Sequence, residues 1–163
     1  MWTSLLLALS LGGTPPADHV LNPDFDTGTA DWKFVLDAGG GGLLQWDATT
    51  GSPVPGSARV ANALGGDRRD SWSQCVLLPP GPYILRAVVA SQVQAGNHCE
   101  LRLVAVDHND CSDGSVVVLD HAAANTHNDG MFEMVAFSAV APPDAAAAVV
   151  YLSHVRVAAA DLG

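Results

Sequence analysis

Residues 79–107, which read PPGPYILRAVVASQVQAGNHCELRLVAVD, decide the fold class of this chain. The opening Pro-Pro-Gly-Pro breaks regular structure, because proline removes a hydrogen-bond donor and glycine permits a tight reversal. Residues 83–90 and 99–107 then alternate in the way that is typical of β-strands. In the second segment one face holds Cys99, Leu101, Leu103 and Ala105, and the other holds Glu100, Arg102, Val104 and Val106. We expect the first face to be buried and the second to be half polar.

The rest of the chain continues this pattern of short strands separated by turn-forming residues. We expect a short apolar strand at the start of residues 18–29, and further strands in residues 31–36, 43–47, 57–61, 72–78, 115–119, 132–140 and 149–157. No internal repeat and no convincing amphipathic helix interrupts them, and the alanines of 145–148 are expected to form a loop that leads into a strand. The pattern predicts an all-β fold, a β-sandwich jelly roll.

Composition limits the size of the protein and the class of its partners. The chain has 163 residues, enough for one domain, and a formal charge of −10 from 17 acidic and 7 basic residues. It has no basic stripe that would neutralise phosphates, so nucleic acid and anionic membrane surfaces are not expected partners. No segment after the N-terminus has the ~18 uninterrupted apolar residues of a membrane helix, so we expect no membrane span.

The N-terminal residues resemble an export signal. An apolar run, LLLALSL at residues 5–11, has the length of a signal-peptide core, although no Lys or Arg precedes it. We therefore predict that residues 1–17 are a signal peptide and that residues 18–163 form the exported domain. The expected location is outside the cell or in the cell envelope, extracellular or periplasmic, where a disulfide can persist.

Three cysteines, Cys75, Cys99 and Cys111, allow three different single disulfides, and the residues alone do not choose among them. If Cys99 begins a strand that runs to residue 107, the chain travels about 26 Å away from it, and Cys111 would have to double back. A bridge between Cys75 and Cys111 is easier to form, and it leaves Cys99 as a thiol on the buried face.

The sequence contains no nucleophile elbow, phosphate-binding glycine loop or paired-cysteine zinc pattern. Glu100 and Glu133 are the only glutamates available for a glycosidase pair, and most aspartates lie in turns. The six histidines lack metal-binding spacing, and the oxygen-rich loop 107–114 is read as a disulfide-bridged turn. We therefore expect a protein that is not an enzyme.

Aromatic residues make up only 6% of the chain, so each one counts. Trp32 and Tyr83 lie in apolar strands and are expected in the core. Trp46 and Trp72 lie among polar residues, as do indoles that stack on sugar rings; the alternative is that both cap the edge of the core. If their strands are adjacent, Arg86, Glu100 and Arg102 would share a sheet face and line a groove, or else form an exposed salt-bridged surface.

Residues 20–28, VLNPDFDTG, with Asp31 and Trp32 three residues further on, resemble the opening motif of the family 4/9 carbohydrate-binding modules, which have a galactose-binding-like jelly-roll fold. Other segments are similar to motifs of that family, in residues 51–58 (GSPVPGSA), 73–76 (SQCV), 80–83 (PGPY) and 110–112 (DCS). The resemblance spans residues 18–157. It implies a disulfide between Cys75 and Cys111 and a non-catalytic module that binds polysaccharide on a concave sheet face or in a cleft at the rim.

The expected ligand-binding residues are Trp46, Trp72, Gln74, Arg86, Glu100 and Arg102. Asp24 and Asp26 are candidate ligands of a structural calcium ion, although the last strand, SHVRV at residues 153–157, lacks the aspartates that are common in this family. The main alternative is a structural or protein-interaction module of the cell envelope that keeps the fold without binding sugar. A weaker alternative is a domain associated with a glycoside hydrolase.

Overall fold

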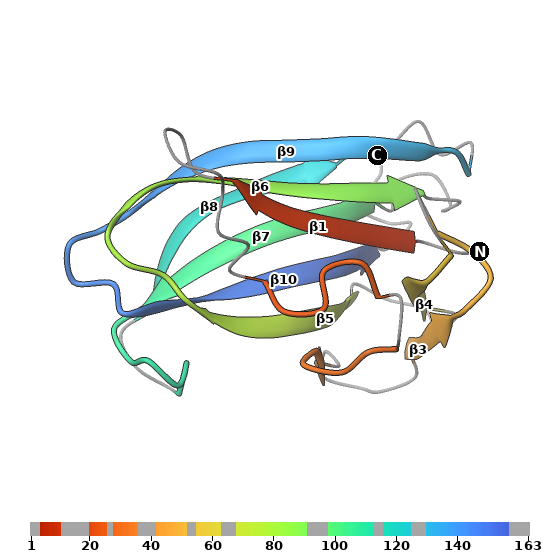
Figure 1. Cartoon of the computed structure of the whole chain (residues 1–163), viewed down its shortest axis with the longest axis horizontal. Helices are drawn as coiled ribbons and strands as arrows, with labels where there is room; N and C mark the ends of the chain where they lie inside the picture. Colours follow the sequence, from red (N-terminus) through yellow and green to blue (C-terminus); the bar gives the residue numbers. More distant parts are fainter. Residues whose placement is uncertain are drawn as a thin grey trace.

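The computed structural model describes residues 4–10, 20–25, 28–35, 42–51, 55–62, 68–90, 98–112, 116–124 and 130–156. Every regular element in these ranges is a β-strand (Figure 1). The strands are β1 (Ser4–Ser10), β2 (Lys33–Val35), β3 (Gly42–Asp47), β4 (Ser57–Asn62), β5 (Arg68–Leu77), β6 (Gly81–Ala90), β7 (His98–Val106), β8 (Val116–Ala124), β9 (Phe132–Ala141) and β10 (Ala147–Arg156). The expected all-β fold is therefore confirmed.

The strands form two main sheets and a hairpin, with antiparallel pairing throughout. One sheet has five strands in the order β2-β5-β10-β7-β8, and the other has three in the order β1-β6-β9. Among the residues that the structure describes, strands β3 and β4 pair only with each other. In Figure 1, β1, β6 and β9 cross the upper part of the molecule, and β10 and β5 cross the lower part. This is the arrangement of a β-sandwich.

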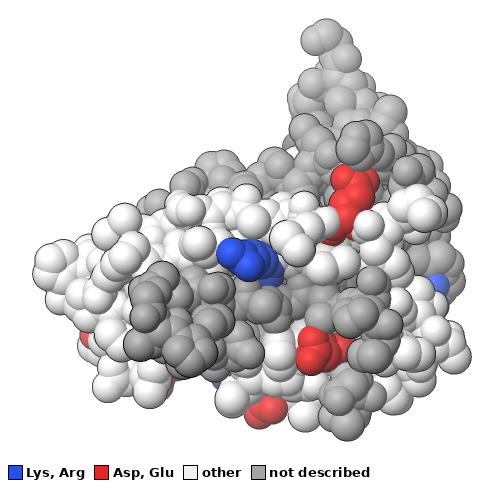
Figure 2. All heavy atoms as spheres, turned by 45° about the horizontal axis from the view of Figure 1, so that its top comes forward, with Lys and Arg blue, Asp and Glu red and all other residues white. Residues whose placement is uncertain are grey.

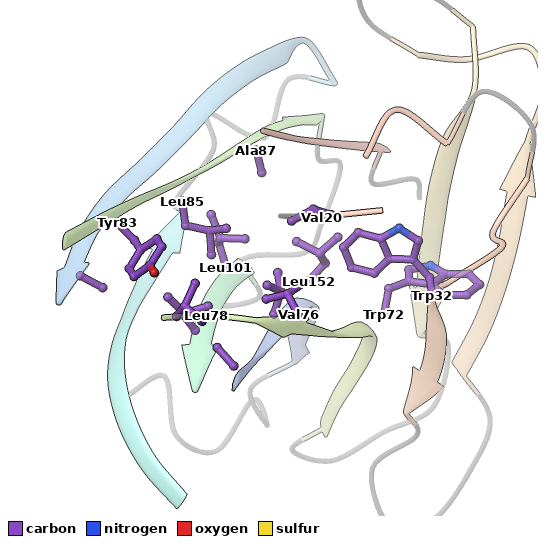
Figure 3. Packing of buried hydrophobic residues seen from close by; sticks show 14 of the residues in the cluster. Val20, Trp32, Trp72, Val76, Leu78, Tyr83, Leu85, Ala87, Leu101 and Leu152 are labelled. Atoms are coloured by element: carbon purple, nitrogen blue, oxygen red, sulfur yellow. The ribbon is translucent and has the colours of Figure 1, made fainter. Parts of the chain in front are cut away.

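The hydrophobic core lies between the two larger sheets. Alternate residues of β6 are buried, from Tyr83 through Leu85 to Val89, because successive side chains of a strand point to opposite faces. Figure 3 shows Leu85 close to side chains from the five-stranded sheet, among them Leu101 and Leu152. The predicted buried face of β7 is confirmed, since Cys99, Leu101, Leu103 and Ala105 all belong to this core.

All nine strands expected from residue 31 onward are present, with ends that differ by a few residues. The alanine run also behaves as expected: Ala145 N–H donates to the Pro142 carbonyl at 3.1 Å in a turn, and β10 starts directly afterwards at Ala147. The short strand expected at the start of residues 18–29 is not found in its described part, because Val20 and Leu21 lie in a bend; residues 18 and 19 lie outside the described residues. Asn22 and Phe25 have φ angles of 47° and 52°, which suit the turn that was expected to follow the strand.

The predicted signal peptide includes a segment that is regular in this structure. Ser4–Ser10 forms β1, an edge strand of the three-stranded sheet, and its backbone pairs with β6 from Ser4 opposite Ala90 to Ser10 opposite Ile84. An apolar run of this length is as suitable for a strand as for an export signal. Removal of residues 1–17 on export stays a prediction.

The turn that replaces the first expected strand is held together by its own side chains. The Asn22 side-chain amide donates to the carbonyls of Gly28, at 2.9 Å, and Ala30, at 3.0 Å. The Trp32 indole N–H donates to the Asn22 carbonyl at 3.1 Å. Phe25 is fully buried, and its ring lies 5.0 Å from that of Trp32. The segment that resembles the family motif therefore closes a loop onto the core, and Trp32 is a core residue as expected.

A disulfide joins Cys75 on β5 to Cys111, with the Cα atoms 5.9 Å apart. Cys111 lies in the turn after β7, where its N–H donates to the His108 carbonyl at 3.1 Å. The predicted pairing and the predicted bridged turn are both confirmed. Cys99 lies outside the disulfide and is buried, also as expected.

Replacing both bridged cysteines, Cys75→Ser with Cys111→Ser, should lower the free energy of unfolding by about 4 kcal/mol, because the bridge closes a loop between residues 36 apart and restricts the unfolded chain. Urea denaturation of the oxidised proteins measures this difference. Cys99→Ala is the matched control and keeps the bridge. Titration of unreduced, denatured wild-type protein should find one thiol; three thiols, or equal stability of the double variant and the wild type, would contradict the assignment.

Candidate functional site

The five-stranded sheet has a second face, turned away from the core, on which polar side chains gather. Residues directly opposite each other in an antiparallel pair point to the same side of the sheet. One such row runs across four strands through Lys33, Ser73, Tyr151 and Arg102, and the next runs through Val35, Ser71, Ser153 and Glu100. Arg69 lies one step further along β5, on the same side. We call this side of the sheet the polar face and define it by Lys33, Arg69, Ser71, Ser73, Glu100, Arg102, Tyr151 and Ser153. Four of these residues are buried: Ser71, Ser73, Glu100 and Ser153.

Glu100 is the central group of the polar face. Its side chain is only 4% exposed, and its Oε2 accepts a hydrogen bond from Arg69 Nη2 at 2.9 Å. Its other oxygen, Oε1, is buried and accepts no hydrogen bond from the residues that the structure describes. Arg102 Nε lies 3.9 Å from Oε1, too far for a hydrogen bond. One acceptor of a buried carboxylate is therefore left unused.

Arg102 is held in place by stacking instead of hydrogen bonding. Its guanidinium lies over the Tyr151 ring, 4.4 Å from the centroid, a cation–π contact. Arg102 Nε is buried and, in the described part of the chain, has no hydrogen-bond partner. Tyr151 thus orients the arginine, and the buried Nε of Arg102 is left without a hydrogen-bond partner among the described residues.

The gap between Glu100 and Arg102 suits a particular kind of ligand group. Buried polar atoms are nearly always hydrogen-bonded in proteins, so an unused acceptor and an unused donor 3.9 Å apart favour a third group that binds both. A hydroxyl has the right chemistry for this, because it donates one hydrogen bond, to Glu100 Oε1, and accepts another, from Arg102 Nε. Both atoms are buried in this structure, so a ligand reaches them only after the side chains around them move. The polar face is therefore chemically suited to a polyhydroxylated ligand.

The structure corrects the prediction for Trp72. Its side chain is buried and belongs to the hydrophobic core, with the exposed Phe34 ring 6.1 Å away, so it offers no surface on which a sugar can stack. Polar neighbours such as Arg69 suggested exposure, but Arg69 points to the opposite side of β5. The alternative reading, that the indole packs at the core, is the correct one for Trp72.

Gln74 is also buried, and its side chain is fully used within the protein. Its Nε2 donates to the carbonyls of Leu21, at 2.8 Å, and Asp31, at 3.2 Å, and its Oε1 accepts from the Leu21 N–H at 2.7 Å. These bonds tie the N-terminal loop to β5. Gln74 positions the loop, and it does not reach the polar face.

Trp46 is the predicted aromatic residue that remains partly exposed, at 37%. It lies on β3, opposite the buried Ala58 of β4, and its indole N–H donates to the Phe25 carbonyl at 2.6 Å. This bond anchors the indole, while part of its ring stays accessible at the surface. Trp46 stands in the β3–β4 hairpin and so belongs to a different sheet from Glu100 and Arg102.

The hairpin that carries Trp46 is strengthened by Asp47. Hydrogen bonds from the hydroxyl and the N–H of Thr49 lower the pKa of Asp47 to about 2. Asp47 is therefore ionised at neutral pH, and its Oδ2 lies 2.8 Å from Arg59 Nη1 on β4. The ion pair joins the two strands of the hairpin.

Arg86 does not join Glu100 and Arg102. The condition for grouping them was that β6 and β7 are adjacent, but β6 belongs to the three-stranded sheet and β7 to the five-stranded sheet. Arg86 also alternates with the buried Leu85 and Ala87, so it points away from the core on the far side of the sandwich. The predicted groove that includes Arg86 is therefore wrong.

The metal prediction is untested. Asp24 is exposed, and Asp26 lies outside the described residues. Within the described ranges, no group of three His, Cys, Asp or Glu side chains is placed to hold a metal ion. The two candidate glutamates of a glycosidase pair, Glu100 and Glu133, lie on β7 and β9, in different sheets.

Glu100 and Arg102 are the only two residues of the polar face that the sequence-based site includes. The partners that the structure gives them, Arg69 and Tyr151, were not among the predicted site residues. Tyr151 alternates with the buried Val150 and Leu152, so the period of two along β10 carried the signal that it faces the other way. What the sequence did not reveal is that β10 lies beside β7.

Comparison with solved structures shows similar folds at low sequence identity. Tailspike protein 4 of bacteriophage CBA120 matches over 83% of this chain and 19% of its own, with a TM-score of 0.62 and 15% identity. TmCBM61, solved with β-1,4-galactotriose, matches over 86% of this chain and 88% of its own, with a TM-score of 0.50 and 15% identity. The CBM22-1 and GH10 modules of xylanase 10B from Clostridium thermocellum, solved with xylohexaose, match over 83% of this chain and 28% of their own, with a TM-score of 0.51 and 12% identity.

These likenesses confirm the β-sandwich fold, which carbohydrate-binding modules share, while the more specific resemblance to family 4/9 is not confirmed. The chain spans about a fifth of the tailspike protein that it matches. No protein-family model matches the chain, and no match is found among curated protein sequences. The described residues contain no helix that is long and apolar enough to cross a membrane.

Gln74→Ala should lower the free energy of unfolding by about 3 kcal/mol, because it removes three hydrogen bonds that hold the partly buried backbone of the N-terminal loop. Urea denaturation tests this. Ser73→Ala is the control on the same strand, since it removes a single long contact of 3.4 Å and should cost less than about 1 kcal/mol. Equal effects of the two substitutions would show that Gln74 does not hold the loop.

Proposed function

We propose that this protein is a non-catalytic module that binds polysaccharide on the polar face of its five-stranded sheet. The observation that carries the proposal is the buried oxygen of Glu100, which accepts no hydrogen bond from the described residues, facing an arginine whose donors are unused. Glu100 and Arg102 bind a sugar hydroxyl between them, and Tyr151 orients the arginine. Trp46 contributes a separate, partly exposed ring.

Two further observations support the proposal. The fold is that of proteins solved with β-1,4-galactotriose and with xylohexaose, although the low identity carries no information about this chain's own ligand. The second is that Glu100 and Arg102 occupy alternate positions of one strand, which places an acceptor and a donor side by side on the same face. Kinship with family 4/9 modules rests on the sequence motifs around Asn22 and is part of the proposal.

The disulfide between Cys75 and Cys111 favours an oxidising location, outside the cell or in the cell envelope. A structural calcium ion held by Asp24 and Asp26 stays a prediction. Comparing polysaccharide binding and thermal unfolding with and without a chelator tests it, and an unchanged melting temperature would rule out a structural ion.

The proposal is tested by a binding panel of soluble β-1,4-galactan, xylan, β-glucan and polygalacturonate, followed by calorimetry on those that bind. Arg102→Met keeps the apolar stem over Tyr151 but removes the donors, and it should weaken binding by about tenfold or more, equivalent to ~1.4 kcal/mol, as expected for a hydrogen bond to a charged group. Arg86→Met is the matched control, since it removes a cation from the opposite side of the sandwich and should leave the affinity unchanged.

Equal losses of affinity in Arg102→Met and Arg86→Met would show that the polar face is not the binding site. Affinity that is unaffected by Arg102→Met but lost in Trp46→Ala would move the site to the β3–β4 hairpin. Failure of the wild-type protein to bind any polysaccharide of the panel would overturn the proposed function itself.

A second candidate, a protein-interaction module, is favoured by the outer surface of the three-stranded sheet. Met134 and Val140 of β9 are 70% and 69% exposed there. Figure 2, with the top of Figure 1 turned forward, shows a described surface on which uncharged residues predominate. If this surface binds protein, Met134→Asp should abolish an association that light scattering detects in the wild type. A wild-type protein that is monomeric at high concentration, together with glycan binding, would favour the first candidate.

A further inference from the structure

The polar face has a charge opposite to that of the protein as a whole. The chain carries a formal charge of −10. Among the described outward side chains of β2, β5, β10 and β7, the cations are Lys33, Arg69 and Arg102, and Glu100 is the one carboxylate. Three positive charges and one negative charge give these described side chains a net charge of +2. Such a concentration of the few cations on one side of an acidic protein indicates a ligand of negative charge.

The single negative charge of Glu100 does not neutralise both of the arginines beside it, Arg69 and Arg102. Its Oε2 is bonded to Arg69 at 2.9 Å, while Arg102 lies 3.9 Å from Oε1 and makes no hydrogen bond within the described residues. The Arg102 side chain is only 23% exposed, so water solvates its positive charge incompletely. A guanidinium that is partly desolvated and has unused donors binds an anionic oxygen strongly, because charge-assisted hydrogen bonds are about twice as strong as neutral ones.

A second unpaired cation lies on the same row of the sheet. Lys33 on β2 is exposed and makes no ion pair with the described residues, and it is in register with Ser73, Tyr151 and Arg102. Three strand spacings of about 4.8 Å separate the backbones of Lys33 and Arg102 by roughly 14 Å. Between them stand the small Ser73 and the ring of Tyr151. The row therefore presents two positive charges at a distance that a ligand of several sugar units spans.

We infer that the polysaccharide bound on the polar face is anionic and carries carboxylate groups, as uronate-containing glycans do. This inference rests on the proposed function. One carboxylate of the glycan binds the guanidinium of Arg102, while a carboxylate further along the chain lies near the ammonium group of Lys33. Once Glu100 Oε1 is uncovered, a neighbouring hydroxyl donates to it, so the same site binds both the hydroxyls and the charge of a uronate.

The inference is tested with polygalacturonate and its fully methyl-esterified form, two polymers with the same sugar backbone of which only the first is charged. Calorimetry with the full protein should give at least tenfold tighter binding of the acid form. That preference should shrink severalfold between about 0.05 M and 0.5 M salt, because salt screens charge interactions. Lys33→Gln should weaken binding of the acid form by about threefold or more and weaken binding of the ester by less. Arg86→Gln is the control and should change neither.

Each outcome separates this inference from the function on which it rests. Equal binding of the acid and the ester, or binding of neutral galactan or xylan only, overturns the anionic ligand and leaves polysaccharide binding standing. No binding of any polysaccharide overturns both. Equal effects of Lys33→Gln on acid and ester would also contradict the inference, since an exposed lysine that acts through its charge must distinguish the two polymers. Lys33 is exposed, so its variant should keep the fold, which circular dichroism checks.

Discussion

The position of β10 between β5 and β7 is the constraint on which both the core and the candidate site depend. Along β10, Val150 and Leu152 point into the core, and Tyr151 and Ser153 point to the polar face. A slip of one residue in the pairing would exchange the two sets, so burial of the apolar side fixes the register strongly. That register in turn brings Arg102 over Tyr151. The buried apolar side chains on one face of each strand therefore fix the positions of the polar side chains on the other face.

The N-terminal loop shows the same dependence at the edge of the sandwich. Gln74 points inward from β5 and uses its amide to hold the backbone at Leu21 and Asp31, while Asn22 closes the loop that buries Phe25. Polar residues in this part of the sequence thus serve the fold. The residues that resemble a family motif are the ones that hold this loop, which explains why such a motif indicates a fold more directly than a ligand.

Much of the fold could be predicted because strand alternation is a local property. The alternation of residues 83–90 and 99–107 located β6 and β7, and the geometric argument about Cys99 favoured the correct disulfide. Strand order is not local, and for that reason Arg86 was grouped with residues of another sheet. Trp72 was misplaced for a related reason: polar neighbours in sequence say little about exposure when alternate residues face opposite sides. Glu100 and Arg102 were identified from their strand, but their partners Arg69 and Tyr151 required the tertiary pairing.

The central claim is that ligands bind to the outward face of the five-stranded sheet. Amide chemical-shift mapping by NMR during titration with an oligosaccharide that the protein binds tests it most directly, because the method locates the site without altering any residue. The account predicts that the largest shifts cluster at Lys33, Arg69, Glu100, Arg102 and Tyr151, on four strands of one sheet. Shifts centred on β6 and β9, or confined to the β3–β4 hairpin around Trp46, would contradict it.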